Sequence, residues 1–402
     1  MKYVIFLGDG MADRPLDFLQ NKTPLQLANK PNIDNLAKMG EVGLVKTVPN
    51  GLKPGSDVCN LSVMGYNPSI YYTGRSSIEA VSMGIKLAPT DVTYRCNLVT
   101  LSNEEKLEDK TMIDYSAGEI STQEAKELIS ALKKHFDSQD FTLYSGISYR
   151  HCLVSKKDEQ TAILTPPHDI TGKKIKEYLP KNNDKLLEMI EKSSEFLLNH
   201  PVNQKRIAQG KKPATNCWFW GMGTSPSLPD FYEKTGLKGA VISAVDLVKG
   251  IGILGNMQII EVPNATGDID TNFSGKAEYA LDGLKTNDFV YIHMEAPDEC
   301  GHRGEAKNKI KSIELIDELV VKKVKEGLDK LGEDYTIMIL PDHPTPIETK
   351  THAPEPVPYL IYSNAKNNCT NSSSYCEEEG TKSNILINDG YTLIDKFINY
   401  AK

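Results

Sequence analysis

The sequence lacks the features that mark secreted, membrane-spanning and nucleic-acid-binding proteins. Its seven cysteines contain no CxxC pair and no regular disulfide spacing, so a reducing cytoplasm is the expected setting. The apolar run 3–7 is too short for a signal peptide, and no stretch approaches the ~20 apolar residues of a membrane span. The formal net charge of −8 argues against nucleic acid or an anionic membrane as a partner.

Two common catalytic motifs are also missing. The chain has no GxxxxGK[ST] loop for a nucleotide phosphate, and its Ser56 is not flanked as in the GxSxG elbow of serine hydrolases. An acyl-transfer reaction is therefore disfavoured. What is present is a chain of 402 residues with 39% hydrophobic residues, which is enough for two or three domains with buried cores.

Three short apolar runs, predicted to be buried central strands, are each followed by carboxylate or imidazole side chains. The runs are 2–7, the stretch beginning at Asp288, and 335–340. The residues that follow them are Asp9; Asp298 and His302; and Asp342, His343 and His352. In an open α/β sheet, ligands and metals gather at the carboxyl ends of the strands. Any one of these groups could instead simply cap a strand or a turn.

A serine lies at the predicted start of a short helix, after the Pro/Gly loop 49–54. Ser56 fits an N-cap, whose hydroxyl only satisfies the first helix amides. Beside a metal, the same hydroxyl can lose its proton and act as a nucleophile, with the helix N-terminus stabilising an incoming phosphate. The motif alone leaves both alternatives open.

The alternation of strands and helices predicts the domain organisation. Over 1–60 and 215–350 it is the βαβ pattern of a doubly wound, mostly parallel sheet, so the fold class is α/β. A strand-rich stretch between these parts predicts a smaller inserted α+β domain. We therefore expect one domain in two parts, 1–90 and 171–402, and an insertion at 91–170. The segment 364–383, rich in Asn, Ser, Glu and Lys, is expected to be a mobile surface excursion.

Several cationic side chains are candidates for contacts with an anion. Arg95, Arg150 and His151 lie within apolar strands, where an unpaired charge is costly, and Arg75 lies on a loop. Arginine pairs well with carboxylates and phosphates, so these side chains either bind an anionic substrate or form internal salt bridges. Lys249, on a predicted helix, either holds a phosphate or faces solvent.

The carboxylates, imidazoles and serine together indicate a two-metal site for phosphoryl transfer. Two metal ions about 3.5–4 Å apart, held by Asp and His, activate a nucleophilic oxygen and stabilise the transferred phosphoryl group. The residues in this predicted site are Asp9, Ser56, Asp298, His302, Asp342, His343 and His352. The remaining histidines need no metal under this hypothesis: His135, His151, His168, His200 and His293.

The order of these motifs resembles the alkaline phosphatase superfamily, and specifically the cofactor-independent phosphoglycerate mutases of the archaeal type. The stretches GSDVCNLSVMGYNP, YYTGRSSIEA, YRCNLVT, WFWGMG and EAPDECGHRGE are similar to that family's signatures, and the match runs over nearly the whole chain. The stretches MIDYSAGEIS, TPPHDITGKK and NHPVNQKR are more similar to a bacterial branch, some of whose members are labelled proposed homoserine kinases.

The resemblance implies two divalent ions, which could be manganese, zinc or magnesium. One ion would be held by Asp298, His302 and His352. The other would be held by Asp9, Asp342 and His343, with Ser56 beside it as the nucleophile. The two-part domain would then be the phosphatase-like, metal-binding domain.

The resemblance also implies the substrate, a small phosphorylated metabolite. A phosphate would move from the 3-hydroxyl of glycerate to the serine and back to the 2-hydroxyl, without 2,3-bisphosphoglycerate. The insertion would close over the site and exclude water. The contacts to phosphate and carboxylate would come from Arg75, Arg95, Arg150, His151 and Lys249. The alternatives are a homoserine-phosphorylating phosphotransferase and a metal-dependent phosphohydrolase that does not retain glycerate.

Overall fold

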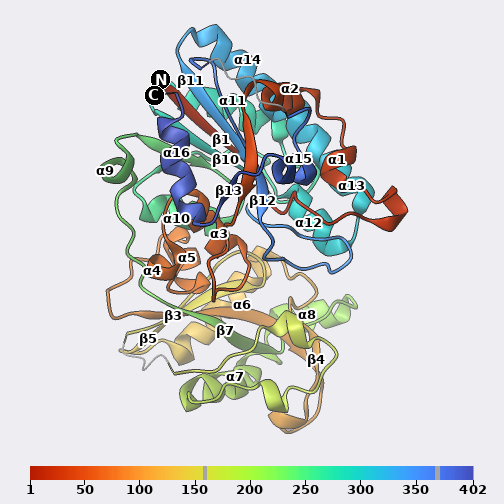
Figure 1. Cartoon of the computed structure of the whole chain (residues 1–402). Coiled ribbons are helices and arrows are strands. Elements are labelled where there is room, and N and C mark those ends of the chain that lie inside the picture. Colours follow the sequence, from red (N-terminus) through yellow and green to blue (C-terminus); the bar gives the residue numbers. More distant parts are fainter. Residues whose placement is uncertain (157–160, 367–371, 402) are drawn as a thin grey trace. The chain divides into compact units, whose positions relative to one another are not determined.

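The computed structural model describes residues 1–156, 161–366 and 372–401, and the chain divides into two compact units (Figure 1). Unit 1 comprises Met1–Tyr72 and Ser227–Lys402, and unit 2 is the continuous segment Thr73–Pro226. Unit 2 includes the predicted insertion, 91–170, and extends beyond it on both sides. The reason is that helix α5 (Arg75–Ser82) and strand β7 (Asn216–Thr224) both pack against β3 (Val92–Leu101).

Unit 1 is built on a sheet that has eight strands in the described part of the chain. The strand order is β13-β2-β12-β11-β1-β10-β8-β9, and within it only β12 runs antiparallel to its neighbours. The strands are β1 (Lys2–Gly8), β2 (Glu41–Val45), β8 (Gly239–Ile242), β9 (Gln258–Ile259), β10 (Phe289–Met294), β11 (Tyr335–Leu340), β12 (Val357–Ser363) and β13 (Leu386–Ile387). The α/β class and the mostly parallel sheet are confirmed.

Helices cover both faces of this sheet. They are α1 (Pro24–Leu27), α2 (Pro31–Met39), α3 (Ser56–Val63), α4 (Pro68–Tyr71), α9 (Phe231–Thr235), α10 (Asp246–Leu254), α11 (Phe273–Gly283), α12 (Ala296–Arg303), α13 (Ala306–Leu315), α14 (Lys322–Leu331), α15 (Glu377–Lys382) and α16 (Leu393–Asn399). A π-helical stretch, η5 (Ile316–Val321), joins α13 to α14. On one face, α2, α11, η5 and α14 pack on the strands through one apolar cluster.

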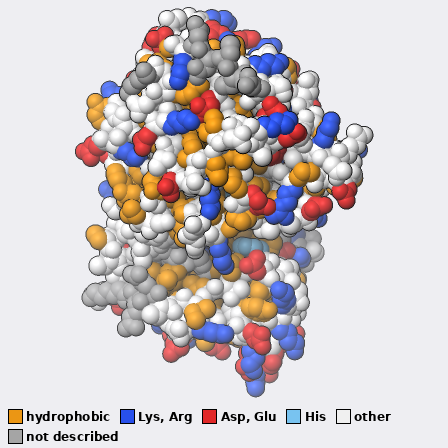
Figure 2. Space-filling model, viewed as in Figure 1, with side chains coloured by type: hydrophobic (Ala, Val, Ile, Leu, Met, Phe, Trp, Pro, Cys, Tyr) orange, Lys and Arg blue, Asp and Glu red, His pale blue; other side chains and the backbone are white. Residues whose placement is uncertain are grey.

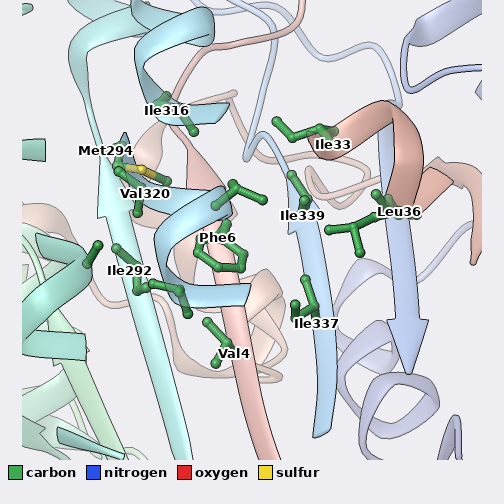
Figure 3. Close-up of a cluster of buried hydrophobic side chains, with 14 of the residues drawn as sticks. Val4, Phe6, Ile33, Leu36, Ile292, Met294, Ile316, Val320, Ile337 and Ile339 are labelled. Carbon is green, nitrogen blue, oxygen red and sulfur yellow. The ribbon is translucent and has the colours of Figure 1, made fainter. Parts of the chain in front are cut away.

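Alternate residues of the central strands form the floor of that cluster. Phe6 of β1, Ile292 of β10 and Ile339 of β11 point to the same side, toward Ile33 of α2 and Ile316 of η5 (Figure 3). Each fully buried side chain of this size stabilises the fold by about 1.5–3 kcal/mol, whereas an exposed ion pair contributes only about 0–1 kcal/mol. The buried cluster, and not surface charge, therefore holds the central strands in place.

The opposite face of the sheet is covered by α3, α10 and α16. The Tyr3 ring of β1 packs edge-on against Phe397 of α16, and the Tyr3 hydroxyl donates to the Ile398 carbonyl at 3.1 Å. On the same face, the Tyr291 hydroxyl of β10 donates to Asn60 Oδ1 of α3 at 2.7 Å. The sheet is thus doubly wound, and α3 is anchored directly beside the central strands.

The segment 364–383 differs in part from the expected mobile excursion. Residues 367–371 lie outside the described residues, but Glu377–Lys382 form α15, which packs on β2 and β12. The apolar side chain of Tyr375 is buried, and its hydroxyl donates to the Pro358 carbonyl at 2.8 Å. A buried aromatic residue within the polar stretch anchors it to the sheet.

Unit 2 is an α+β unit on an antiparallel sheet. Its strands pair in the order β4-β3-β6-β5, and β7 also pairs with β3. Besides β3 and β7, the strands are β4 (Met112–Asp114), β5 (Phe141–Tyr144) and β6 (Arg150–Ser155). Its helices, besides α5, are α6 (Thr122–Phe136), α7 (Asp184–Leu197) and α8 (Pro201–Ala208). Ser121 and Glu124 form a capping box at the start of α6.

Two further features of the structure concern the distribution of charged side chains on its surface and the length of its helices. Acidic and basic side chains are interspersed on the face shown in Figure 2. Such mixing of charges is typical of a solvated surface. Across the described ranges, no helix has both the length and the apolar character needed to cross a membrane.

Candidate metal centre and nucleophile

The central strands of unit 1 bring ligand-type side chains to one edge of the sheet. Asp9 follows β1, and His343 follows β11, which pairs with β1 in parallel. Asp298 and His302 come after β10, on α12 and not on the expected loop. Pro297 lies in the first turn of α12, where its fixed φ favours the start of a helix. The two side chains are four residues apart and therefore lie on one helix face.

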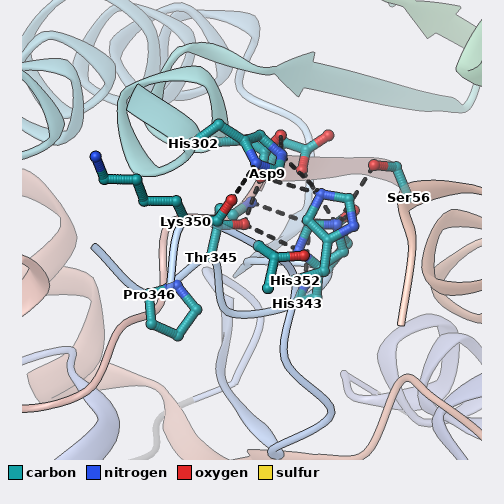
Figure 4. A network of polar contacts seen from close by, with 12 residues as sticks. Asp9, Ser56, His302, His343, Thr345, Pro346, Lys350 and His352 are labelled. Carbon is teal, nitrogen blue, oxygen red and sulfur yellow. Dashed lines mark hydrogen bonds and ion pairs between the residues drawn. The ribbon is translucent and has the colours of Figure 1, made fainter. Parts of the chain in front are cut away.

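The first group of candidate ligands consists of Asp298, His302 and His352. His302 Nε2 lies 3.1 Å from Asp298 Oδ2 and 3.0 Å from His352 Nε2 (Figure 4). On the other side of the ring, His302 Nδ1 lies 3.0 Å from the Lys350 carbonyl and donates to it. In the neutral imidazole this leaves the Nε2 lone pair facing the other two ligands, as in most metal-bound histidines.

The second group consists of Asp9, Asp298 and His343, so Asp298 belongs to both groups. His343 Nε2 lies 3.6 Å from Asp9 Oδ1 and 3.4 Å from Asp342 Oδ2. Asp342 was implied as a ligand in this group, but its oxygens already accept hydrogen bonds, Oδ1 from the Gly10 amide at 3.1 Å and Oδ2 from an Asn60 amide. Asp342 therefore lies beside this group, but it is not among the three residues whose ligand atoms all lie within 4.8 Å of one another.

Both groups fit a divalent cation. In each, one ligand atom per residue lies within 4.8 Å of the others, and atoms about 2.0–2.2 Å from one metal lie up to about 4.4 Å apart. Asp9 Oδ1 is buried without a hydrogen-bond partner among the described residues. Burial raises the pKa of Asp9 well above its ordinary value, and the negative charges of Asp342 and Asp298 raise it further. A cation would satisfy this oxygen and offset that repulsion.

The surroundings lower the pKa of both Asp298 and His343, for different reasons. Burial raises the pKa of Asp298, but hydrogen bonds from His302 and His352 outweigh it and hold the pKa well below its ordinary value. Burial lowers the pKa of His343. For His302, burial lowers the pKa, but the hydrogen bond and the charge of Asp298 outweigh it and raise the pKa to about 9. An anionic carboxylate and a neutral imidazole are the forms that bind a metal.

Ser56 lies next to the second group. It is the first residue of α3 and not the expected N-cap, which is Gly55. Because the Ser56 hydroxyl is not needed for capping, it can face the strand ends, and Ser56 Oγ lies 3.3 Å from His343 Nε2. The Ser56 carbonyl accepts a hydrogen bond from Asn60 at 2.9 Å, which fixes the first turn of the helix.

Two polar residues at this centre were not predicted from the sequence to belong to the site. His293 was assigned no role, but its Nε2 lies 2.8 Å from Asp9 Oδ2. Burial lowers the pKa of His293 to about 3, so the ring is neutral; it donates through Nε2 and accepts from Ser243 at Nδ1. Thr345 contacts Asp298 and His343. The signal for His293 was a polar residue in an apolar strand, opposite Leu7 at the end of β1.

In unit 2, the predicted arginines gather around one carboxylate. Arg75 Nε lies 2.8 Å from Glu79 Oε1, and Arg95 Nε lies 2.9 Å from Glu79 Oε2. The Arg95 guanidinium also lies over the Trp220 ring, 3.9 Å from its centroid. Burial raises the pKa of Glu79, but Arg95, Arg75 and then Arg150 outweigh it and lower the pKa. The expected internal salt bridges therefore exist.

His151 and Lys249 lie in other surroundings. Arg95 is opposite Cys152 in the β3–β6 ladder and His151 is opposite Cys96, so His151 points to the other face of the sheet. It is buried there, and its Nδ1 accepts from the Gly146 amide at 3.1 Å. Lys249, on α10 of unit 1, pairs with Glu261 at 2.8 Å.

Together, the doubly wound sheet and the cluster of buried acids, imidazoles and a serine at its carboxyl edge define a metal-dependent α/β enzyme. Residues 37–203 match the family described as 2,3-bisphosphoglycerate-independent phosphoglycerate mutase. The chain is 50% identical over 363 residues to the enzyme of that name from Methanothrix thermoacetophila, covering 90% of each chain. It is 45% identical over 401 residues to a probable enzyme of that name from Geobacter sulfurreducens, covering 99% of this chain and all of the relative.

Solved structures of similar proteins superpose on the whole chain. A protein from Pyrococcus horikoshii superposes with a TM-score of 0.82 at 29% identity, over 100% of this chain and 97% of the other. The cofactor-independent phosphoglycerate mutase from Thermoplasma acidophilum gives 0.66 at 26% identity, over 100% of both chains. The chain belongs to the family of 2,3-bisphosphoglycerate-independent phosphoglycerate mutases, which confirms the resemblance read from its motifs.

Proposed function

We propose that this protein interconverts 3-phosphoglycerate and 2-phosphoglycerate without 2,3-bisphosphoglycerate, through a phosphoserine at Ser56. The observation that carries the proposal is the Ser56 hydroxyl, 3.3 Å from His343 beside the candidate ligand groups. It occurs in a chain that is 50% identical to an enzyme of that name. A serine at a helix N-terminus next to cations has the environment that a phosphoryl acceptor requires.

Two divalent ions would complete the site. Asp298, His302 and His352 would hold one ion, and Asp9 and His343, with Asp342 and Ser56 beside them, would hold the other. When bound, the ions supply Lewis-acid chemistry, which lowers the pKa of the serine hydroxyl and neutralises charge on the phosphoryl group. Manganese, zinc and magnesium all accept such carboxylate and imidazole ligands.

The chain's own residues would carry the transfer in two balanced steps. In the first, Ser56 Oγ loses its proton and attacks the phosphorus, the bond to the 3-oxygen of glycerate breaks, and that oxygen gains a proton. In the second, the 2-hydroxyl loses its proton and attacks the phosphoserine, the bond from phosphorus to Ser56 Oγ breaks, and Ser56 Oγ regains a proton. The two steps give isomerisation and not hydrolysis only if the glycerate stays bound and water is excluded between them.

The arginines of unit 2 are proposed to bind the phosphate or carboxylate of the substrate. Arg75 and Arg95 both pair with Glu79, and a phosphate or carboxylate of the substrate would fit the same guanidinium donors. Lys249 is a further candidate because its partner, Glu261, is 69% exposed and can give way to a phosphate. For His151 we propose a role in the core, since it is buried on the opposite face of the sheet.

A pair of assays on metal-reconstituted protein tests the function. The first supplies 3-phosphoglycerate without nucleotide and couples the product to enolase. The second supplies homoserine and ATP and follows O-phosphohomoserine. Turnover in the first assay alone is expected. Turnover in the second alone would reassign the substrate, and release of inorganic phosphate from 3-phosphoglycerate without isomerisation would indicate a phosphohydrolase.

A further inference from the structure

Thr345 lies between the two groups of candidate metal ligands. Its side chain is fully buried, two residues beyond His343 in the loop after β11 (Figure 4). Thr345 Oγ1 donates to Asp298 Oδ1 and lies 3.3 Å from His343 Nδ1. One hydroxyl group therefore joins the carboxylate shared by both groups to the imidazole nearest the serine.

The chemistry of the three groups fixes the direction of these hydrogen bonds. A carboxylate can only accept, so the single hydroxyl proton of Thr345 goes to Asp298. The hydroxyl oxygen is then left with lone pairs, and His343 Nδ1 must carry the proton that it donates to Thr345. Nε2 of His343 consequently has its lone pair on the side of Ser56. A metal ligand needs this tautomer.

The backbone of Thr345 is held as firmly as its side chain. Its amide donates to the Ala12 carbonyl at 3.3 Å, and its carbonyl accepts from Lys309 Nζ at 2.9 Å. The same buried ammonium donates to the Ala12 carbonyl at 3.0 Å and to Asp13 Oδ2 at 2.8 Å. All three donors of Lys309 are thus used to tie the loop after β1 to the loop after β11.

Two glycines, Gly10 and Gly301, lie close to Thr345. Gly10 has φ +59°, and a Cβ there would lie 2.5 Å from both Asp298 Oδ1 and Thr345 Oγ1. A Cβ at Gly301 of α12 would lie 2.6 Å from the Thr345 carbonyl. A side chain at either position would therefore displace Thr345 or Asp298, so the packing around the hydroxyl requires glycine at both.

We propose that Thr345 is a positioning residue, which fixes the orientation of Asp298 and the tautomer of His343 and so couples the two metal sites. The inference rests on the proposed metal-dependent transfer. It predicts that loss of a single buried hydroxyl, with no ligand removed, weakens metal binding in both groups, because Asp298 belongs to both.

The test compares three variants of the full-length, metal-free protein. Thr345→Val removes the hydroxyl and keeps the volume, and Thr345→Ser keeps the hydroxyl. Thr336→Val is the matched control, because Thr336 is also fully buried, on β11 itself, and donates to Ser363 at 3.3 Å away from the ligands. Calorimetric titration with Mn²⁺ gives affinity and stoichiometry, and chemical denaturation without metal gives the free energy of unfolding.

We expect Thr345→Val to weaken Mn²⁺ binding about 10–100-fold, the range found for residues that orient metal ligands. Thr345→Ser and Thr336→Val should bind Mn²⁺ as the wild-type protein does, although Thr336→Val loses stability. Wild-type affinity in Thr345→Val would overturn the role of Thr345. If valine prevents folding, Thr345→Ala removes the same hydroxyl without a methyl group beside Asp298, and the same criterion applies.

The outcomes separate this inference from the proposed function. If the wild-type protein itself binds no Mn²⁺, Zn²⁺ or Mg²⁺, the proposed metal centre fails and the inference fails with it. If the wild-type protein binds metal but does not isomerise phosphoglycerate, the proposed function fails, and the effect of Thr345→Val on affinity still decides the role of Thr345.

Discussion

The two units collect their charged side chains in different ways. In unit 1, acids and imidazoles from β1, α12 and the loop after β11 meet at the carboxyl edge of a parallel sheet. In unit 2, arginines from α5 and β3 meet over one face of an antiparallel sheet, around Glu79. Which residues meet at the edge of a sheet depends on where the strands end, whereas which residues meet on its face depends on how the strands pair. We expect the first to carry the chemistry and the second to carry substrate affinity.

The largest effect should come from the serine at the edge of the parallel sheet. Ser56→Ala should lower kcat by at least about 1,000-fold while Mn²⁺ binding persists, because it removes the attacking oxygen and leaves the Asp and His ligands. Ser62→Ala, at a serine that is also buried and lies on the same helix, is the matched control and should retain activity. Substantial turnover by Ser56→Ala would remove the covalent mechanism.

The next largest effect is expected on metal binding, and it should differ between Asp298, which belongs to both groups, and His302, which belongs to one. Asp298→Asn should weaken Mn²⁺ binding at both sites by more than the about 10–100-fold typical of residues outside the ligand set. His302→Gln should weaken binding at one site, because His302 belongs to the first group alone. Elemental analysis and calorimetric titration measure both. Equal stoichiometry in Asp298→Asn and wild-type protein would refute the shared-ligand assignment.

Two arginines of unit 2 should have different effects when substituted: one on the stability of the fold and the other on the affinity for substrate. Arg95 is 11% exposed and stacks on Trp220, so Arg95→Gln should destabilise unit 2 by about 1.5–3 kcal/mol through its lost bond to Glu79. Arg75 is 35% exposed, so Arg75→Gln should raise KM about tenfold, equivalent to about 1.4 kcal/mol, with little loss of stability. Steady-state kinetics and urea unfolding separate these effects. An unchanged KM in Arg75→Gln would exclude it from substrate binding.

The last effect appears only at acidic pH and concerns His151, a buried histidine of unit 2. Burial lowers the pKa of His151 from 6.5 to about 3, so below pH 6.5 the unfolded chain binds a proton that the folded unit does not. Stability should therefore fall as the pH drops from 6.5 toward 3, by about 2 kcal/mol at pH 5. Urea unfolding followed by Trp218 and Trp220, the chain's two tryptophans, reports on unit 2.

Two substitutions define this pH dependence. His151→Gln should remove the loss of stability between pH 6.5 and pH 5. His135→Gln, at an exposed histidine of α6 in the same unit, should keep it. If both variants retain the same dependence as the wild-type protein, another group is responsible for it.

The contrast between residues placed by strand ends and residues placed by strand pairing also explains which features the sequence could predict. Asp9, Asp342 and His343 follow short apolar runs, and such runs mark strand ends without knowledge of their partners. Asp298 and His302 were expected beyond the strand that begins at Asp288, but the helix on which they lie was not predicted. Local sequence was therefore sufficient to propose that these side chains meet, but not to predict the element that holds each of them.

The features that were missed depend on contacts between distant segments. The face on which His151 lies follows from the pairing of β6 with β3, and this ladder cannot be read from either strand alone. The larger extent of unit 2 follows from the pairing of β3 with β7, more than a hundred residues further on. His293 and Thr345 gain their partners only when β1, β10 and the loop after β11 converge.

The central claim is that Ser56 carries the phosphate between the two hydroxyls of glycerate. The most direct measurement is acid quenching of metal-reconstituted protein mixed with 3-phosphoglycerate and no nucleotide, followed by mass spectrometry of the peptide that contains Ser56. We predict phosphate on Ser56 at times when 2-phosphoglycerate is accumulating, and none in Ser56→Ala. Formation of 2-phosphoglycerate at an undiminished rate in Ser56→Ala, with no phosphorylated peptide at any time, would contradict the claim.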